Sequence, residues 1–92
     1  MILEHVEGKN KGDVKLYVLS TCVWCRKTKQ LLNDIGVDYF FVYVDLLDEE
    51  EKQDVVREIE KWNPDSSFPT MVINNNECIV GFKPEDIRKK LG

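Results

Sequence analysis

Residues 14–25, VKLYVLSTCVWC, are the stretch from which the fold can be worked out. Residues 14–19 are almost continuously apolar, which is typical of a central strand that is buried on both faces. Apolar side chains then recur at helical spacing as far as Ile35, and Gly36 follows as a C-terminal cap. A buried strand that leads directly into an amphipathic helix predicts an α/β domain. Cys22 and Cys25 lie at the junction between the two elements.

The remaining elements extend this beginning to a complete domain. Residues 38–45 are aromatic and β-branched, as in a strand. Asp48 with Glu51 resembles a capping box, which predicts the start of a second helix. Residues 71–80 have the pattern of a β-hairpin, and Pro84 stands where a short last helix begins.

The order of these elements, β-α-β-α-β-β-α, determines the topology that we expect. A strand–helix–strand start requires a parallel pair of strands with a right-handed crossover, and the hairpin adds antiparallel strands. The sequence therefore predicts one domain over residues 14–92, with a four-stranded mixed sheet flanked by helices. Residues 1–13 form an N-terminal extension, in which residues 2–6 can add a short strand to the sheet.

Composition and charge exclude several classes of protein. The 92 residues suffice for one domain, and the 33% of charged residues include 17 acidic and 13 basic ones, for a net charge of −4. Proteins that bind nucleic acid usually have the opposite balance, and no apolar run is long enough to span a membrane. The first residues lack the basic and apolar parts of a signal peptide. We expect a cytoplasmic monomer that binds neither nucleic acid nor membrane.

The two cysteines at the strand–helix junction can form a redox-active pair. Unpaired N–H groups and the helix dipole favour a thiolate at Cys22, and Cys25 lies one turn further on the same side. We expect Cys22 to be the nucleophile and Cys25 to resolve the mixed disulfide. No acidic residue lies between positions 22 and 30, which hold three cations: Arg26, Lys27 and Lys29. These cations either tune Cys22 toward its thiolate and attract anionic thiols or acidic partners, or simply form a solvated face. Because they lie next to a dithiol at a helix start, we favour the first interpretation.

Three segments together carry a family resemblance: residues 20–25, the sequence Phe68-Pro69-Thr70, and residues 80–84. From residue 14 to the C-terminus the chain resembles a glutaredoxin of the thioredoxin fold. The resemblance implies a thiol–disulfide oxidoreductase that reduces protein disulfides and needs no cofactor. It also implies that Pro69 is cis and faces the dithiol, and that the backbone of Phe68 binds an extended substrate. Trp24, exposed at the helix start, and Gly81 complete the expected substrate site.

The electron donor is a separate question, because the chain departs from glutathione-dependent glutaredoxins at two places. Leu19 stands where they usually carry Lys or Arg, and residues 80–83, VGFK, replace their Gly-Gly followed by Ser or Thr and Asp. The sequence from Gly81 to Pro84 instead resembles the NrdH-type redoxins, which serve ribonucleotide reductase. This resemblance implies a thioredoxin-reductase-type or other dithiol donor, with glutathione disfavoured.

An alternative is a binding or redox-sensing module in which the cysteines hold a metal ion or an iron–sulfur cluster. Cys22, Cys25, Cys78 and His5 have the chemistry of a Cys3His set. However, only one close cysteine pair exists, so we expect no metal site. Cys78 is expected to be a buried, inert thiol in an apolar strand, and His5 an exposed residue of the N-terminal extension.

Overall fold

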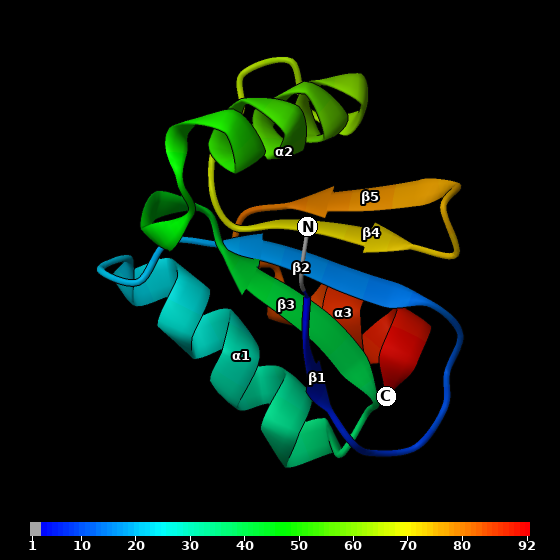
Figure 1. Ribbon diagram of the computed structural model, residues 1–92. Coiled ribbons are helices and arrows are strands. Elements are labelled where there is room, and N and C mark those ends of the chain that lie inside the picture. Colours follow the sequence, from blue (N-terminus) through cyan, green and yellow to red (C-terminus); the bar gives the residue numbers. More distant parts are fainter. Residues whose placement is uncertain (1–2) are drawn as a thin grey trace.

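The computed structural model describes residues 3–92 and shows a five-stranded sheet between two layers of helices (Figure 1). The elements follow in the order β1 (Glu4–Val6), β2 (Val14–Val18), α1 (Val23–Ile35), β3 (Tyr39–Tyr43), the short 3₁₀ helix η1 (Val44–Leu46), α2 (Glu49–Trp62), β4 (Thr70–Ile73), β5 (Glu77–Val80) and α3 (Pro84–Leu91). Within residues 3–92, none of the helices combines the length and the apolar character needed to cross a membrane.

The strand order is β1-β3-β2-β4-β5. β2 and β3 are parallel, whereas β1 pairs antiparallel with β3, and β4 pairs antiparallel with both β2 and β5. The predicted mixed α/β fold of the thioredoxin-like (glutaredoxin) type is confirmed, and the N-terminal strand is its fifth. Because β2 and β3 are parallel, their C-terminal ends meet at one edge of the sheet, where the loop with Cys22 begins.

Helices cover both faces of the sheet, so the central strand β2 is buried on both sides. Leu16 and Val18 belong to the core under α1 and α3, whereas Tyr17, between them, belongs to the core under α2. This alternation explains why the strand has an almost continuous apolar sequence. The end of β2, and therefore the start of the following loop, is held between two packed layers.

The signals that predicted the helix boundaries act as expected. Gly36 ends α1 in the left-handed conformation, with φ 81°, and its N–H donates to the carbonyl of Leu32. Asp48 caps α2, because its carboxylate accepts a hydrogen bond from the N–H of Glu51 at 2.8 Å. Pro84 is the first residue of α3. The predicted strand 38–45 is shorter, because the chain turns into η1 after Tyr43.

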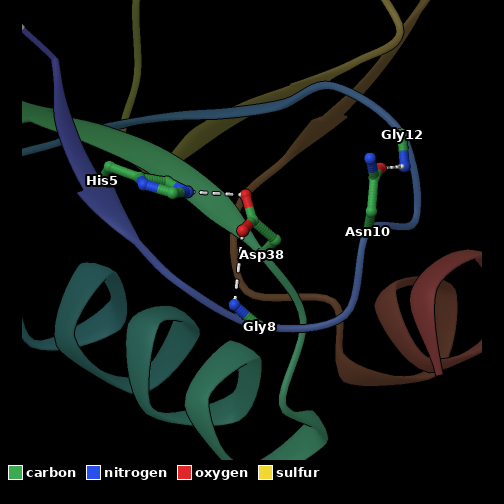
Figure 2. A network of polar contacts seen from close by, with 5 residues as sticks. All are labelled: His5, Gly8, Asn10, Gly12 and Asp38. Carbon is green, nitrogen blue, oxygen red and sulfur yellow. Dashed lines mark hydrogen bonds and ion pairs between the residues drawn. The ribbon is translucent and has the colours of Figure 1, made fainter.

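The N-terminal extension is part of the sheet and is anchored by a polar network (Figure 2). Nε2 of His5, on β1, lies 2.8 Å from Oδ1 of Asp38, and the N–H of Gly8 donates to Oδ2 of the same carboxylate. The imidazole also stacks on Phe40, with ring centroids 4.6 Å apart. His5 is exposed as predicted, but it is a bonded strand residue. Of the predicted strand 2–6, Ile2 lies outside the described residues.

Candidate dithiol active site

Cys22 is the N-cap of α1. Its backbone is extended, with φ −89° and ψ 120°, and its Sγ accepts a hydrogen bond from the N–H of Cys25 at 3.2 Å. Its own N–H donates to the carbonyl of Leu19 at 3.3 Å, which closes the turn between β2 and the helix. The sulfur is thus placed where a helix presents free N–H groups and the positive end of its dipole, a position that stabilises a thiolate.

Cys25 differs from Cys22 in its surroundings. Its side chain is only 1% exposed, whereas Cys22 is half-buried, and both are free thiols. The pKa of Cys25 is raised to about 12, first by burial and second by the hydrogen bond with the Cys22 side chain, against a smaller opposite effect of the Leu19 backbone. Cys25 therefore remains a protonated thiol at neutral pH, next to an accessible sulfur.

Asp45, which was not predicted as a site residue, holds the loop that leads to Cys22. Its two carboxylate oxygens accept hydrogen bonds from Ser20, from the N–H at 2.9 Å and from the hydroxyl at 2.5 Å. These two bonds lower the pKa of Asp45, so the carboxylate stays ionised. An acidic residue at the end of the aromatic and β-branched run was the available signal, because parallel neighbouring strands end at the same edge of a sheet.

The three cations predicted to tune Cys22 have different surroundings. Lys27 lies over the ring of Trp24, with Nζ 5.0 Å from the centroid. Lys29 is held on the other side, where Nζ donates to the Tyr43 hydroxyl at 2.8 Å and lies 3.7 Å from the centroid of Phe41. Arg26 is exposed. The effect of these cations on the thiolate stays a prediction.

Arg26 and Lys29 line a cavity of about 320 Å³ that also contains both cysteines. Its full lining is Leu19, Ser20, Cys22, Cys25, Arg26, Lys29, Gln30, Asn33 and Tyr43. Lys27 is not part of it. Gln30 and Asn33 were not predicted as site residues, although their spacing from Arg26 and Lys29 places them on the same helical stripe.

The loop between α2 and β4 presents the second predicted part of the site. The peptide bond between Phe68 and Pro69 is cis, as predicted. Buried Asn63 organises the loop, because its Nδ2 donates to Ser67 and to the Thr70 hydroxyl, which in turn donates to the Ser67 carbonyl at 2.7 Å. Within residues 3–92, neither the N–H nor the carbonyl of Phe68 has a hydrogen-bond partner.

An aromatic groove brings together three of the predicted substrate-binding residues. It has a volume of about 250 Å³ and is lined by Trp24, Phe68, Gly81 and Phe82. Trp24 is 55% exposed and stacks on Phe82, with ring centroids 5.9 Å apart. Pro69 follows Phe68 in the sequence and is buried. Its carbonyl accepts a hydrogen bond from the N–H of Gly81 at 2.8 Å. Phe82 was not predicted as a site residue.

The residues of the alternative metal site are not gathered. In the part of the chain that the structure describes, no three His, Cys, Asp or Glu side chains are grouped so that they could hold a metal ion. Cys78 lies on β5 and is half-buried, so the prediction that it is buried was too strong. The reason is that β5 is an edge strand with only β4 beside it.

Comparisons with known proteins agree with this architecture. The family model of glutaredoxin matches residues 14–79. The chain belongs to the glutaredoxin family. Among solved structures it is similar to methanoredoxin from Methanosarcina acetivorans, with 52% identity, a TM-score of 0.90 and coverage of 92% of this chain and 90% of the other. It is equally similar to a glutaredoxin from Methanosarcina mazei, with 52% identity, a TM-score of 0.91 and coverage of 98% and 87%.

A more distant likeness concerns the NrdH-type redoxins. NrdH-redoxin from Escherichia coli is 22% identical, with a TM-score of 0.63 and coverage of 84% of this chain and 92% of the other, which shows a shared fold. The resemblance to glutaredoxins drawn from the sequence is confirmed by the family model, and the likeness to NrdH-redoxin extends to the fold. Glutaredoxins are generally thiol–disulfide oxidoreductases, and the paired cysteines of this member are arranged for thiol redox chemistry.

Proposed function

We propose that this glutaredoxin-family protein reduces disulfides of other proteins through Cys22 and Cys25. The observation that carries the proposal is the difference between the two sulfurs. Cys22 is accessible and accepts the N–H of Cys25 at 3.2 Å, whereas Cys25 is buried and its pKa is raised to about 12. A half-exposed sulfur at a helix start is suited to attack, and a shielded thiol one turn away is suited to resolve.

The reaction transfers two electrons from the dithiol to the target. The Cys22 thiolate attacks one sulfur of the target disulfide, the target S–S bond breaks, and the other target sulfur leaves as a thiolate that takes up a proton. Cys25 then loses its proton and attacks Cys22 in the mixed disulfide. The Cys22–Cys25 bond forms, and the second target sulfur leaves as a thiol. The products are a reduced target and an oxidised protein.

The backbone of Phe68 supports an extended protein substrate. Its free N–H and carbonyl can pair with one residue of a target segment, in the way that a strand adds to a sheet edge. The loop that carries them is held by buried Asn63, so little of the binding energy is spent on ordering it.

For the electron donor we propose a thioredoxin-reductase-type enzyme or another dithiol, with glutathione disfavoured. Leu19 packs against the core under α2 and offers no cation for a carboxylate of glutathione. Gly81 is followed by Phe82, which stacks on Trp24, and by Lys83, so no acidic group stands there to receive the glutathione amine. Loss of two charge-assisted hydrogen bonds weakens binding by about a hundredfold or more.

The test supplies oxidised protein with one of three donors: dithiothreitol, glutathione with glutathione reductase, or NADPH with a thioredoxin reductase. A disulfide-containing protein is the acceptor, and free thiols are counted over time. We expect turnover with dithiothreitol and with the reductase, little with glutathione, and none in Cys22→Ser. In Leu19→Lys we expect glutathione turnover to increase. Saturable turnover of the unmodified protein with glutathione contradicts the donor assignment, and inactivity with every donor contradicts the function.

A further inference from the structure

Two hollows of different chemistry lie on opposite sides of the start of α1. Cys22, Arg26, Lys29 and Asn33 are spaced by four, three and four residues, so they form one stripe along the helix, and this stripe lines the polar cavity. Trp24 is two residues from both Cys22 and Arg26, which places it about 200° around the helix axis. It lines the aromatic groove. A segment bound at Cys22 therefore has a different wall on each side.

The wall of the cavity is cationic. Arg26 and Lys29 both line it, and neither forms an ion pair within residues 3–92. Lys29 is fixed by its hydrogen bond to Tyr43 and by the ring of Phe41, so its charge is held in place without a carboxylate. Asp45 is the acidic residue bonded to the cavity wall, and both of its oxygens are bonded to Ser20.

The wall of the groove is aromatic. Trp24 is 55% exposed although it stacks on Phe82, and Phe68 and Gly81 form the rest of the lining. Lys27 lies over the Trp24 ring, so even the cation on this side is placed on an aromatic face. Tryptophan and phenylalanine that remain accessible in a hollow bind large apolar side chains.

We infer that the preferred target is an extended protein segment with a large apolar side chain on one side of the reacting cysteine and an acidic side chain on the other. The inference rests on the proposed function, because the free backbone of Phe68 aligns the segment and Cys22 attacks its disulfide. A helix with its side chains is about 10–12 Å across. An extended strand covers that distance in three to four residues, at about 3.3 Å each. The two side chains therefore lie within about two residues of the cysteine.

The test uses short peptides that are each oxidised to their own symmetrical disulfide. One series has Phe-Leu before the cysteine and Glu-Glu after it, a second has the reverse order, and control series replace either pair by Gln-Gln. Reduced protein is mixed with each peptide, and oxidation is followed through tryptophan fluorescence and thiol counting, with no other donor present. Two electrons pass from Cys22 and Cys25 to each peptide disulfide, which gives two peptide thiols.

We expect one of the two orders to react about tenfold faster than the control in which Gln-Gln replaces Phe-Leu. It should react about threefold faster than the control in which Gln-Gln replaces Glu-Glu. The reverse order gains neither advantage, because the two walls are fixed relative to Cys22. Arg26→Gln removes the preference for Glu and keeps that for Phe-Leu, whereas Lys11→Gln, the same change of charge in the loop before β2, removes neither. The preference for Glu decreases in salt.

The outcomes separate the inference from the function on which it rests. If all peptides are reduced at the same rate, or both orders equally well, the protein is a reductase and the inference is wrong. If no peptide is reduced although Cys22 is free to react with iodoacetamide, the proposed function itself fails.

Discussion

Asp38 and Asp45 flank the two ends of β3, and each holds another segment of the chain through its carboxylate. The two segments have different roles. Asp38 precedes the strand and binds His5 and Gly8, which fastens β1 and the following loop to the sheet (Figure 2). Asp45 follows the strand and binds the N–H and hydroxyl of Ser20, which fastens the loop before Cys22. In each case one carboxylate accepts two hydrogen bonds from a distant part of the chain.

The difference between the two ends lies in what the fastened segment carries. At the Asp38 end it is an edge strand, and the nearby loop is tied further by the side chain of Asn74, which accepts the N–H of Asp13 at 2.9 Å. At the Asp45 end it is the approach to a nucleophile. Stability and chemistry are thus separated along one strand, and substitutions at the two ends are expected to affect different measurements.

The largest expected contrast is between two cysteines. Cys25→Ser stops turnover after the first attack, because no thiol remains to resolve the mixed disulfide between Cys22 and the target. Cys78→Ser leaves turnover nearly unchanged, because Cys78 lies on the edge strand β5 and is not part of the cavity with the dithiol. Mass spectrometry of the Cys25→Ser reaction should show a stable adduct with the target. Continued turnover of Cys25→Ser, or its loss in Cys78→Ser, contradicts the assignment.

The second contrast is between the two sulfurs of the dithiol and depends on pH. The pKa of Cys25 is raised to about 12, so at pH 8 only about one molecule in ten thousand carries its thiolate, a fraction that rises about tenfold per pH unit. With limiting iodoacetamide we expect labelling of Cys22 and not of Cys25 from pH 7 to 9. Labelling of Cys25 should appear only as the pH approaches 12. Peptide mapping after each reaction measures both, and early modification of Cys25 contradicts the assignment.

The third contrast compares the two carboxylates directly. Asp45→Ala removes both hydrogen bonds to Ser20 and frees the loop before Cys22. We expect this change to raise the activation free energy by about 1 kcal/mol, which corresponds to about a fivefold decrease in the rate of peptide disulfide reduction. Asp38→Ala is expected to lower the free energy of unfolding by about 1 kcal/mol while the rate stays the same. Stopped-flow kinetics and urea unfolding of both variants provide the comparison. Equal rate losses in the two variants would mean that the ends are not separate.

The fold was predictable because its signals are local. The nearly continuous apolar run of β2, the helical spacing after Cys22 and the cap at Gly36 each involve neighbouring residues, and the order of the elements then restricts the topology. The end of β3 was less predictable. Val44 is as apolar as the strand before it and is buried, but the chain already turns there to bring Asp45 to Ser20.

The site was predictable in part, for the same reason. The cysteines and their helix start are a local pattern, and Phe68, Pro69 and Gly81 followed from the family resemblance. Asp45 and Phe82 were missed as site residues, because their roles depend on which segments lie side by side. The bond between Ser20 and Asp45 joins residues 25 positions apart. The His5–Asp38 pair spans 33 positions, and no periodicity indicates it.

The smallest expected effect concerns this His5–Asp38 pair, and it measures how far the N-terminal strand is independent of the chemistry. His5→Ala removes an exposed hydrogen bond to Asp38 and the stacking on Phe40, so we expect it to lower the free energy of unfolding by about 0.5–1 kcal/mol. A double-mutant cycle with Asp38→Ala isolates the pair from the bond between Asp38 and Gly8. Disulfide reduction by both single variants and by the double variant should stay within about twofold of the unmodified protein, because no change in stability of this size alters the folded fraction appreciably. A slower reaction in His5→Ala, with unchanged stability, would show that β1 influences the dithiol through β3, and the separation between the two ends of that strand would then be wrong.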